Sequence, residues 1–371
     1  MTRVLITGGA GFIGSHAADA LLVAGYEVRL FDNLSPQVHG AQRERPSYLH
    51  REAELVVGDI TDALAVERAL RGADIVLHLA SAVGVGQSMY DIDSYVRTNE
   101  LGTATLLQAL SRRPVERLVV ASSMSIYGEG LYRAVDHHAE LAPDERPIDQ
   151  LRNGEWELRD AAGHILDPVP TPETKPPSLS SIYALNKYAQ ERMCLITGNA
   201  YGIPTIALRF FNVFGPRQAL SNPYTGVLAI FAARLLNGRR PLVFEDGLQR
   251  RDFVHVKDVA RACRIAIETD RMNDVFNVGS GQSRTIVSVA RDLARVMERS
   301  DIAPEITGKY RAGDIRHCFA DIAKSRALLG FEPSVRFEDG LAELADYLAD
   351  QIADDQAEQA AAELSRRGLV A

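Results

Sequence analysis

Tyr183 and Lys187 are the residues of this chain whose types and spacing most clearly suggest chemistry. Residues four apart share one face of a helix, so the phenol and the ammonium group would project together. A free tyrosine has a pKa of about 10 and is a poor base at neutral pH, but a nearby positive charge stabilises the phenolate. The same spacing also occurs on solvated helix faces, so other motifs must decide. With Ser123 upstream, the pair predicts a proton-transfer site in which Tyr183 is the general base.

A glycine-rich turn near the N-terminus could hold a pyrophosphate. Gly8, Gly11 and Gly14 follow an apolar run over residues 4–7 and precede an amphipathic stretch over residues 15–24. Glycine lets the backbone approach the pyrophosphate, whose charge the amides and dipole of a helix N-terminus stabilise. The strand, turn and helix context therefore predicts a dinucleotide site.

Asp32 ends the second predicted strand, over residues 27–31, at about the spacing from the turn expected for an acid that binds a ribose. A carboxylate accepts hydrogen bonds from ribose hydroxyls and repels a 2′-phosphate. Residues 33–35 supply no arginine for such a phosphate, so the sequence favours NAD over NADP. The alternative is a polar residue in a turn at the end of the strand. Together with Tyr183 and Lys187, the pattern indicates a nicotinamide-dependent redox site.

The elements that must position these residues alternate between strand-like and helical patterns. The strand-like runs cover residues 4–7, 28–31, 55–57, 75–79, 118–121 and 205–209. This alternation predicts an α/β fold, a Rossmann-type doubly wound parallel sheet with the cofactor along the carboxyl ends of its strands. After Arg209 the pattern is less regular and is interrupted by glycine and proline, which indicates a smaller C-terminal substrate-binding α/β domain.

Composition narrows the function classes. The chain has 371 residues, a formal net charge of −8 and three isolated cysteines. A nucleic-acid partner therefore has no electrostatic support, and reduced thiols indicate the cytoplasm. The chain starts directly in a predicted strand, and no apolar run reaches membrane-spanning length, so we expect neither a signal peptide nor membrane insertion.

Ten motifs follow one another in order over residues 1–347. They are GGAGFIG from Gly8, GDI from Gly58, HLAS from His78, TNELGT from Thr98, SSMSIYG from Ser122, YALNK from Tyr183, RFFNVFGPR from Arg209, RRDFVHVKDV from Arg250, FNVGSG from Phe276 and RAGD from Arg311. In these motifs the chain resembles the extended short-chain dehydrogenases/reductases, and more narrowly the NAD-dependent nucleotide-sugar epimerases and dehydratases of the UDP-glucose 4-epimerase type.

The resemblance implies a role for individual residues. Tyr183 would be the base, Ser123 would hydrogen-bond the reacting sugar hydroxyl, and Lys187 would bind the nicotinamide ribose. The residues that it implies for NAD are Gly8, Gly11, Phe12, Ile13, Gly14, Asp32, Asn33, Asp59, Ile60, Leu79, Ala80, Asn99, Tyr183 and Lys187. Those that it implies for the nucleotide-sugar are Val85, Ser123, Asn212, Arg251, Arg311 and Asp314. Arginine suits the diphosphate because its planar fork can bind phosphate bidentately.

The residues after Ser123 separate the reactions of this family. Dehydratases resemble this motif but carry an Asp-Glu pair next, because eliminating water needs an extra acid and base. Decarboxylating relatives usually carry a glutamate in the same stretch. Met124 and Ser125 stand here instead, which favours oxidation and re-reduction of one sugar carbon, C4, the chemistry of an epimerase. A 4-keto-sugar reductase, a dehydratase or decarboxylase, and a non-enzymatic dinucleotide sensor remain alternatives.

We expect three parts in the chain. Residues 1–208 and 253–285 form the NAD-binding domain, residues 209–252 and 286–345 the nucleotide-sugar domain, and residues 346–371 a helical tail. An inserted lobe over residues 129–180 separates Ser123 from Tyr183 by much more than is usual in the family.

The lobe is expected to fold over the sugar side of the cleft and to shape substrate choice. His137, His138 and His164 lie in it without the spacing of metal ligands, so we expect no metal. The resemblance also implies a homodimer whose interface is built from the helices near residues 98–110 and 183–197. The apolar residues that could support that interface are Leu101, Leu106, Leu107 and Leu195.

Overall fold

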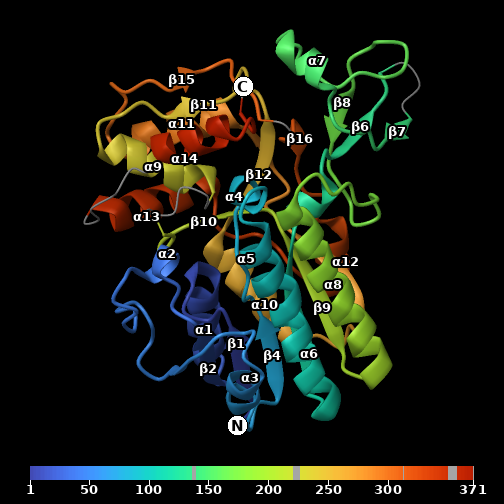
Figure 1. Ribbon diagram of the computed structural model, residues 1–371, viewed down its shortest axis with the longest axis vertical. Helices are drawn as coiled ribbons and strands as arrows, with labels where there is room; N and C mark the ends of the chain where they lie inside the picture. The colour runs from blue at the N-terminus through green and yellow to red at the C-terminus, as the bar shows by residue number, and fades with distance from the viewer. Residues whose placement is uncertain (136–138, 220–225, 312, 350–356, 371) are drawn as a thin grey trace.

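A seven-stranded parallel sheet forms the lower half of the molecule in the computed structural model (Figure 1). The structure describes residues 1–135, 139–219, 226–311, 313–349 and 357–370. The strand order is β13-β9-β5-β4-β1-β2-β3, and every neighbouring pair is parallel. The strands are β1 (Arg3–Thr7), β2 (Glu27–Asp32), β3 (Glu54–Val57), β4 (Ile75–His78), β5 (Arg117–Ser123), β9 (Thr205–Phe210) and β13 (Asp274–Val278). This confirms the predicted doubly wound sheet, to which β13 adds a strand that the sequence pattern missed.

Helices cover both faces of the sheet because its central strands are apolar on both sides. In β1, for example, Val4 and Ile6 face one buried cluster and Leu5 faces the other. The first cluster is closed by α1 (Phe12–Val23), α10 (Val256–Glu268) and the segment after α12 (Ala323–Leu329). The second is closed by α3 (Ala63–Ala69), α6 (Gly102–Arg112) and α8 (Ile182–Tyr201).

The smaller domain lies at the carboxyl ends of these strands, in the upper left of Figure 1. Its sheet combines β10 (Asn212–Phe214), β12 (Arg250–His255), β14 (Ser283–Thr285) and β16 (His317–Cys318), and β11 (Leu242–Val243) pairs with β15 (Glu305–Ile306). A separate apolar core joins α9 (Val227–Leu236), α11 (Ile286–Val296) and α13 (Phe337–Ala349).

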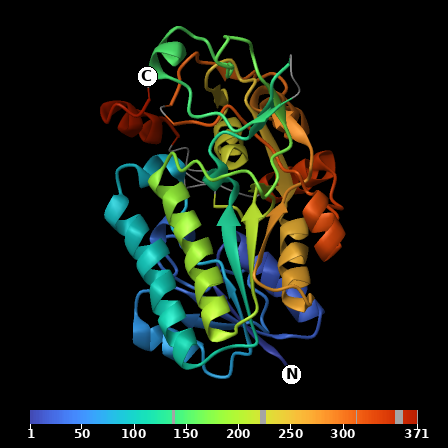
Figure 2. The same cartoon turned by 90° about the vertical axis from the view of Figure 1, so that its right-hand side faces the viewer.

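The inserted lobe is built on a small antiparallel sheet, in the order β7-β6-β8, at the upper right of Figure 1. Its elements are β6 (Leu131–Arg133), β7 (Glu140–Leu141), α7 (Ile148–Arg152) and β8 (Asp167–Val169). Tyr132, Ala134, Leu158 and Leu166 form its core. Figure 2 shows the lobe above the carboxyl end of the large sheet. His137 and His138 lie outside the described residues.

The chain ends in α14 (Ala357–Arg366), which packs back on the body. Residues 346–349 of the expected tail belong instead to α13. Leu364 is buried, the Arg367 guanidinium lies 4.4 Å from the Tyr90 ring centroid, and Val370 forms a β-bridge with Arg311. In the described part of the chain, no helix has the length and apolar character needed to cross a membrane.

Candidate active site

A cleft of about 670 Å³ opens at the carboxyl ends of the parallel strands, between the large sheet and the smaller domain. It lies at the switch point where β1 is flanked by β2 and β4, which is where open α/β sheets bind ligands. The residues predicted for NAD that line it are Gly8, Gly11, Phe12, Ile13, Gly14, Asp32, Asn33, Ile60, Leu79, Ala80, Tyr183 and Lys187. Val85, Ser123 and Asn212 from the predicted substrate set line the same cleft.

The glycine turn has no room for side chains. A Cβ on Gly8 would lie 2.8 Å from the Ala80 nitrogen, and one on Gly14 would lie 2.5 Å from the Gly8 oxygen. Gly8 also has a positive φ of 67°, which disfavours other residues. Gly11 is the N-cap of α1, and no side chain caps this helix end. The free backbone amides in the first turn of α1 are therefore available to an anion.

Asp32 is held at the end of β2 by its own neighbourhood. Its Oδ2 accepts a hydrogen bond from the Ala10 amide at 3.0 Å, and its Oδ1 accepts one from the Leu34 amide at 2.9 Å. His39 of α2 (Pro36–His39) places Nε2 3.7 Å from the same carboxylate. Burial lowers the pKa of His39, against the attraction of Asp32. No sequence pattern points to His39, because only the fold of the α2 turn brings it back over Asp32.

Tyr183 and Ser123 come together from two different elements. Ser123 ends β5, and Tyr183 is the second residue of α8, whose first turn is capped by the Ser181 hydroxyl. Burial raises the pKa of Tyr183, and a hydrogen bond with the Ser123 side chain opposes that shift. The Ser88 hydroxyl of α4 (Val85–Ser88) accepts a hydrogen bond from the Tyr183 amide at 3.1 Å. Serine hydroxyls thus hold both the backbone and the phenol of the proposed base.

Lys187 lies one turn further along α8, on the same face, and is almost fully buried. Burial lowers the pKa of its ammonium group to about 8, against the attraction of Cys194 and Glu191. Its Nζ donates to Gln190 Oε1 at 2.7 Å. Lys187 does not lower the pKa of Tyr183 in the chain by itself, contrary to the expectation from their spacing.

Gln190 connects Lys187 to a buried polar group centred on His78. Its amide nitrogen lies 2.9 Å from Thr103 Oγ1, which is also 3.0 Å from His78 Nε2. His78 Nδ1 lies 2.7 Å from Thr7 Oγ1, and burial lowers the pKa of His78 to about 3. His78 is therefore a neutral residue that joins strands and helices beneath the cleft.

Asp59 and Asn99, both expected to bind NAD, lie outside the lining of the cleft. Burial raises the pKa of Asp59, but hydrogen bonds from Asn33 and Thr61 outweigh it and lower the value. Asn99, in the π-helical turn η1 (Arg97–Leu101) that follows α5 (Ile92–Val96), accepts the Ala82 amide at 2.7 Å through Oδ1. Its place is thus beneath the loop that lines the cleft.

The substrate end offers unused polar atoms. Asn212 Oδ1 is buried and has no hydrogen-bond partner among the described residues, and the same is true of Arg311 Nε. The Arg311 guanidinium lies 4.2 Å from the Phe244 ring centroid. Met124 and Ser125 line the cleft beside Ser123, and the Ser125 hydroxyl lies 2.9 Å from the Ser123 hydroxyl.

Arg251 and Asp314 meet each other but lie outside the lining of the cleft, as Arg311 does. The closest Arg251–Asp314 approach is 3.6 Å. Arg251 also donates to the carbonyl oxygens of Arg250, Ile315 and Arg316. Arg251 therefore braces the backbone of the predicted nucleotide segment in this structure.

The described residues of the inserted lobe contribute nothing to the lining of the cleft. They pack instead on residues 310–311 and 313–319, for example through Trp156, whose ring centroid lies 6.4 Å from that of Tyr310. The cleft lining thus gives no direct support to the prediction that the lobe folds over the sugar. Among the described residues there is no cluster of three side chains suited to a metal ion.

Comparison with known proteins adds to this geometry. Residues 4–149 and 161–279 match the model of the NAD-dependent epimerase/dehydratase family. The dTDP-L-rhamnose 4-epimerase of Burkholderia thailandensis is 36% identical over 94% of this chain and 96% of its own length.

Two solved structures share the fold. A UDP-N-acetylglucosamine 4-epimerase from Methanobrevibacter ruminantium, in complex with UDP-N-acetylmuramic acid, is 31% identical, with a TM-score of 0.76 over 95% of this chain and 99% of that one. A Thermus thermophilus UDP-glucose 4-epimerase in complex with NAD is also 31% identical, with a TM-score of 0.74 over 95% of this chain and 100% of that one.

Proposed function

Because the chain belongs to the NAD-dependent epimerase/dehydratase family, we propose that it is an enzyme that epimerises a nucleoside-diphosphate sugar at C4 through a transient 4-keto sugar. The observation that carries this proposal is that Tyr183, Ser123 and Lys187 line the same cleft as the glycine turn. A proton acceptor and a dinucleotide cradle facing one space are what oxidation of a sugar hydroxyl requires.

The residues of the cleft fit NAD. The turn at Gly8 and Gly14 leaves a space that a Cβ would fill, Asp32 offers a carboxylate for a ribose, and Lys187 lies beside the proposed base. NAD, when bound, supplies the redox chemistry by taking up the electron pair of the sugar C4–H bond and later returning it. The selection of NAD over NADP rests on Asp32, which repels a 2′-phosphate.

Tyr183 carries the proton in both halves of the reaction. Its oxygen removes the proton of the C4 hydroxyl, while Ser123 hydrogen-bonds the same oxygen of the sugar and fixes its distance from Tyr183. After the keto sugar has turned its other face toward the cofactor, Tyr183 returns the proton to the C4 oxygen. The site must therefore hold the nucleotide firmly and the sugar loosely.

Met124 and Ser125 favour epimerisation over the alternatives within the family. Elimination of water needs an acid and a base beyond Tyr183. The positions after Ser123 offer a thioether and a hydroxyl, and the hydroxyl is engaged with Ser123. A 4-keto-sugar reductase would be expected to use NADP, which Asp32 disfavours, and a non-enzymatic sensor would not need Ser123, Tyr183 and Lys187.

The test is a panel of nucleotide-sugars followed by NMR. The panel contains dTDP-L-rhamnose, UDP-glucose and UDP-N-acetylglucosamine, because the relatives act on sugars of these kinds. We expect at least one of them to reach a steady mixture of C4 epimers with catalytic NAD. Loss of water from the sugar, or stoichiometric consumption of cofactor, would contradict the proposal.

We also propose that the enzyme is a cytoplasmic homodimer. Its three cysteines are buried and unpaired, which suits a reducing compartment. Apolar side chains are exposed on α5, η1 and α8, namely Ile92, Val96, Leu101, Leu185 and Ile196. Leu106, Leu107 and Leu195, which were expected to support the interface, belong to the core of the protomer instead.

A further inference from the structure

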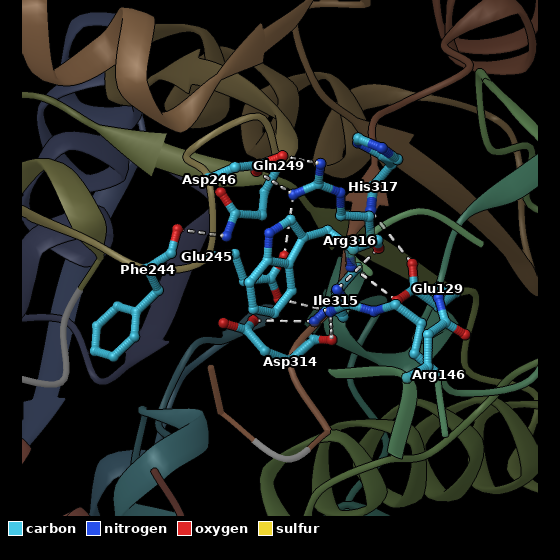
Figure 3. A network of polar contacts seen from close by, with 12 residues as sticks. Glu129, Arg146, Phe244, Glu245, Asp246, Gln249, Asp314, Ile315, Arg316 and His317 are labelled. Atoms are coloured by element: carbon cyan, nitrogen blue, oxygen red, sulfur yellow. Dashed lines mark hydrogen bonds and ion pairs between the residues drawn. The ribbon is translucent and has the colours of Figure 1, made fainter. Parts of the chain in front are cut away.

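The backbone from Asp314 to Arg316 is held by guanidinium groups from two parts of the molecule (Figure 3). Arg146, from the inserted lobe, donates to the Asp314 carbonyl oxygen at 2.9 Å. Arg251 of β12 donates to the carbonyl oxygens of Ile315 and Arg316. Three consecutive carbonyl groups are thus fixed by cationic side chains, which make stronger hydrogen bonds than neutral donors.

Glu129, where the lobe begins, holds the other side of this segment. Its Oε1 accepts a hydrogen bond from the Arg316 amide at 2.8 Å, and its Oε2 accepts one from the His317 amide at 3.2 Å. Tyr132 donates its hydroxyl to Oε2 at 2.8 Å. The carboxylate is almost fully buried. Glu129 and Arg146 therefore fix both the amides and the carbonyl groups of one short segment.

The Arg316 side chain extends this contact into the smaller domain. It is fully buried and pairs with Glu157 of the lobe and with Glu245 and Asp246 of the smaller domain, the last at 2.7 Å. Figure 3 shows Asp246 and Glu245 on one side of Arg316 and Glu129 with Arg146 on the other. Arg146 closes the network through Glu245 Oε1 at 2.9 Å.

His317 takes part as a neutral side chain. Its Nδ1 accepts the Arg250 amide at 3.0 Å, so the ring proton lies on Nε2, which donates to Glu157 Oε2 at 3.0 Å. A second ring proton would face the Arg250 N–H and is disfavoured, in line with the pKa of His317, which burial lowers. His317 is therefore neutral near neutral pH and donates to Glu157.

We propose that Arg146 is a positioning residue for the nucleoside-diphosphate end of the substrate, through its hold on residues 314–316. This inference rests on the proposed function and on the prediction from the sequence that Arg311 and Asp314 contact the nucleotide. It assigns the lobe to nucleotide affinity, because the described lobe residues contact residues 310–319 and none lines the cleft.

The first experiment compares wild type with Arg146→Met/Glu245→Gln, a double variant that removes the buried Arg146–Glu245 ion pair. Arg316 keeps Glu157 and Asp246 as partners. Glu129 keeps the hydrogen bonds from Tyr132 and from the Arg316 and His317 amides. We expect the Kd for UDP and for dTDP, measured by calorimetry, to rise about tenfold, the loss of one charged hydrogen bond. The KM for the nucleotide-sugar should rise with it, while kcat and NAD binding stay near wild type. Arg146→Lys, which keeps the charge and places its donors on a single nitrogen, should recover part of the affinity.

Arg152→Met is the matched control. Arg152 belongs to the same lobe, but it is two-thirds exposed, and its ion pair within the described part of the chain is with the exposed Asp149. The Arg152→Met variant should bind UDP and dTDP as tightly as the wild-type protein does. A folded, NAD-binding double variant with wild-type affinity for both nucleotides would overturn the positioning role and leave the proposed function intact. A wild-type protein that binds neither nucleotide would overturn both.

Hydrogen exchange on the wild-type protein tests the same idea without a substitution. UDP or dTDP should slow amide exchange in residues 310–319 and also in lobe residues 144–158, because Arg146 and Glu157 join the two. Protection of residues 310–319 with unchanged exchange in the lobe would contradict the inference, whatever the variants do.

Discussion

At the scale of single residues, Tyr183 rests as a neutral phenol. Burial raises its pKa, and the Ser123 hydrogen bond only partly opposes that shift. Lys187, whose pKa is about 8, donates a hydrogen bond to the side chain of Gln190. The base must therefore be activated in the complete complex, where the positive nicotinamide ring adds the charge that stabilises a phenolate.

Tyr183→Phe should lower kcat by at least about a thousandfold, since it removes the proton carrier and leaves the shape of the cleft intact. NAD should stay bound, because the substitution removes only one oxygen. Ser123→Ala should slow the reaction less. The check is the epimerisation rate together with NAD released on denaturation. A Tyr183→Phe enzyme at wild-type rate would exclude Tyr183 as the base.

Glu157 makes the docking of the lobe sensitive to acid. Burial raises its pKa, but hydrogen bonds with His317 and Arg316 outweigh burial and lower the value to about 2 from the usual 4.5. A carboxyl whose pKa is lowered on folding stabilises the protein above its unfolded pKa and loses that effect as the pH falls through its folded pKa.

Glu157→Gln should therefore cost about 2 kcal/mol of unfolding free energy at neutral pH, a value reduced for the partial exposure of the group. The difference from wild type should shrink as the pH falls from 4.5 toward 2. Thermal unfolding as a function of pH measures it. A difference that is constant over this range would show that the ion pairs of Glu157 are not its cause.

At the scale of elements, the first turn shows how strictly the sequence specifies the cofactor site. Gly14→Ala places a methyl group against the Gly8 oxygen, so the turn must open. We expect NAD affinity to fall at least about tenfold, because the amides no longer converge on one pyrophosphate. Gly25→Ala is the control, since nothing lies within 4 Å of its added Cβ, although Gly25, unlike Gly14, has a positive φ that disfavours alanine. Equal NAD affinity in both variants would refute this role of the turn.

The elements that the sequence predicted are those whose pattern lies within one short stretch of the chain. Apolar runs and glycine spacing predict β1, the turn and α1, and the four-residue spacing places Tyr183 and Lys187 on one face of α8. Each depends on residues close together in the chain, so their spacing in the sequence is enough to predict how they are arranged in space.

The rest depends on contacts between distant parts of the chain. Arg146 reaches Asp314, and Glu129 reaches Arg316, across about half of the sequence. Before the fold is known, both look like ordinary charged residues of a loop. For the same reason Leu106 and Leu195 could be recognised as apolar but not assigned to core or interface, and the docking side of the lobe was not predictable.

At the scale of the whole molecule, the exposed apolar side chains on α5, η1 and α8 need a partner. Leu185 and Ile196 are 45% and 59% exposed, and Leu101 is 48% exposed. We expect light scattering to give a dimer at micromolar concentration, because burial of such a stripe is favourable. Leu185→Glu/Ile196→Glu should give a monomer that still binds NAD. Met272→Glu, a change at an equally exposed residue outside these helices, should remain dimeric, and a wild-type monomer would refute the interface.

The central claim, that one C4–H bond is broken and remade with the same electron pair, is tested most directly with a substrate deuterated at C4. The sugar from the panel that turns over is incubated with the enzyme and NAD in ordinary water, and both epimers are examined by NMR and mass spectrometry. The account predicts that deuterium stays on C4 of the product and that no reduced cofactor accumulates. Loss of deuterium to water would contradict it, because that outcome requires removal of C4 hydrogen as a proton.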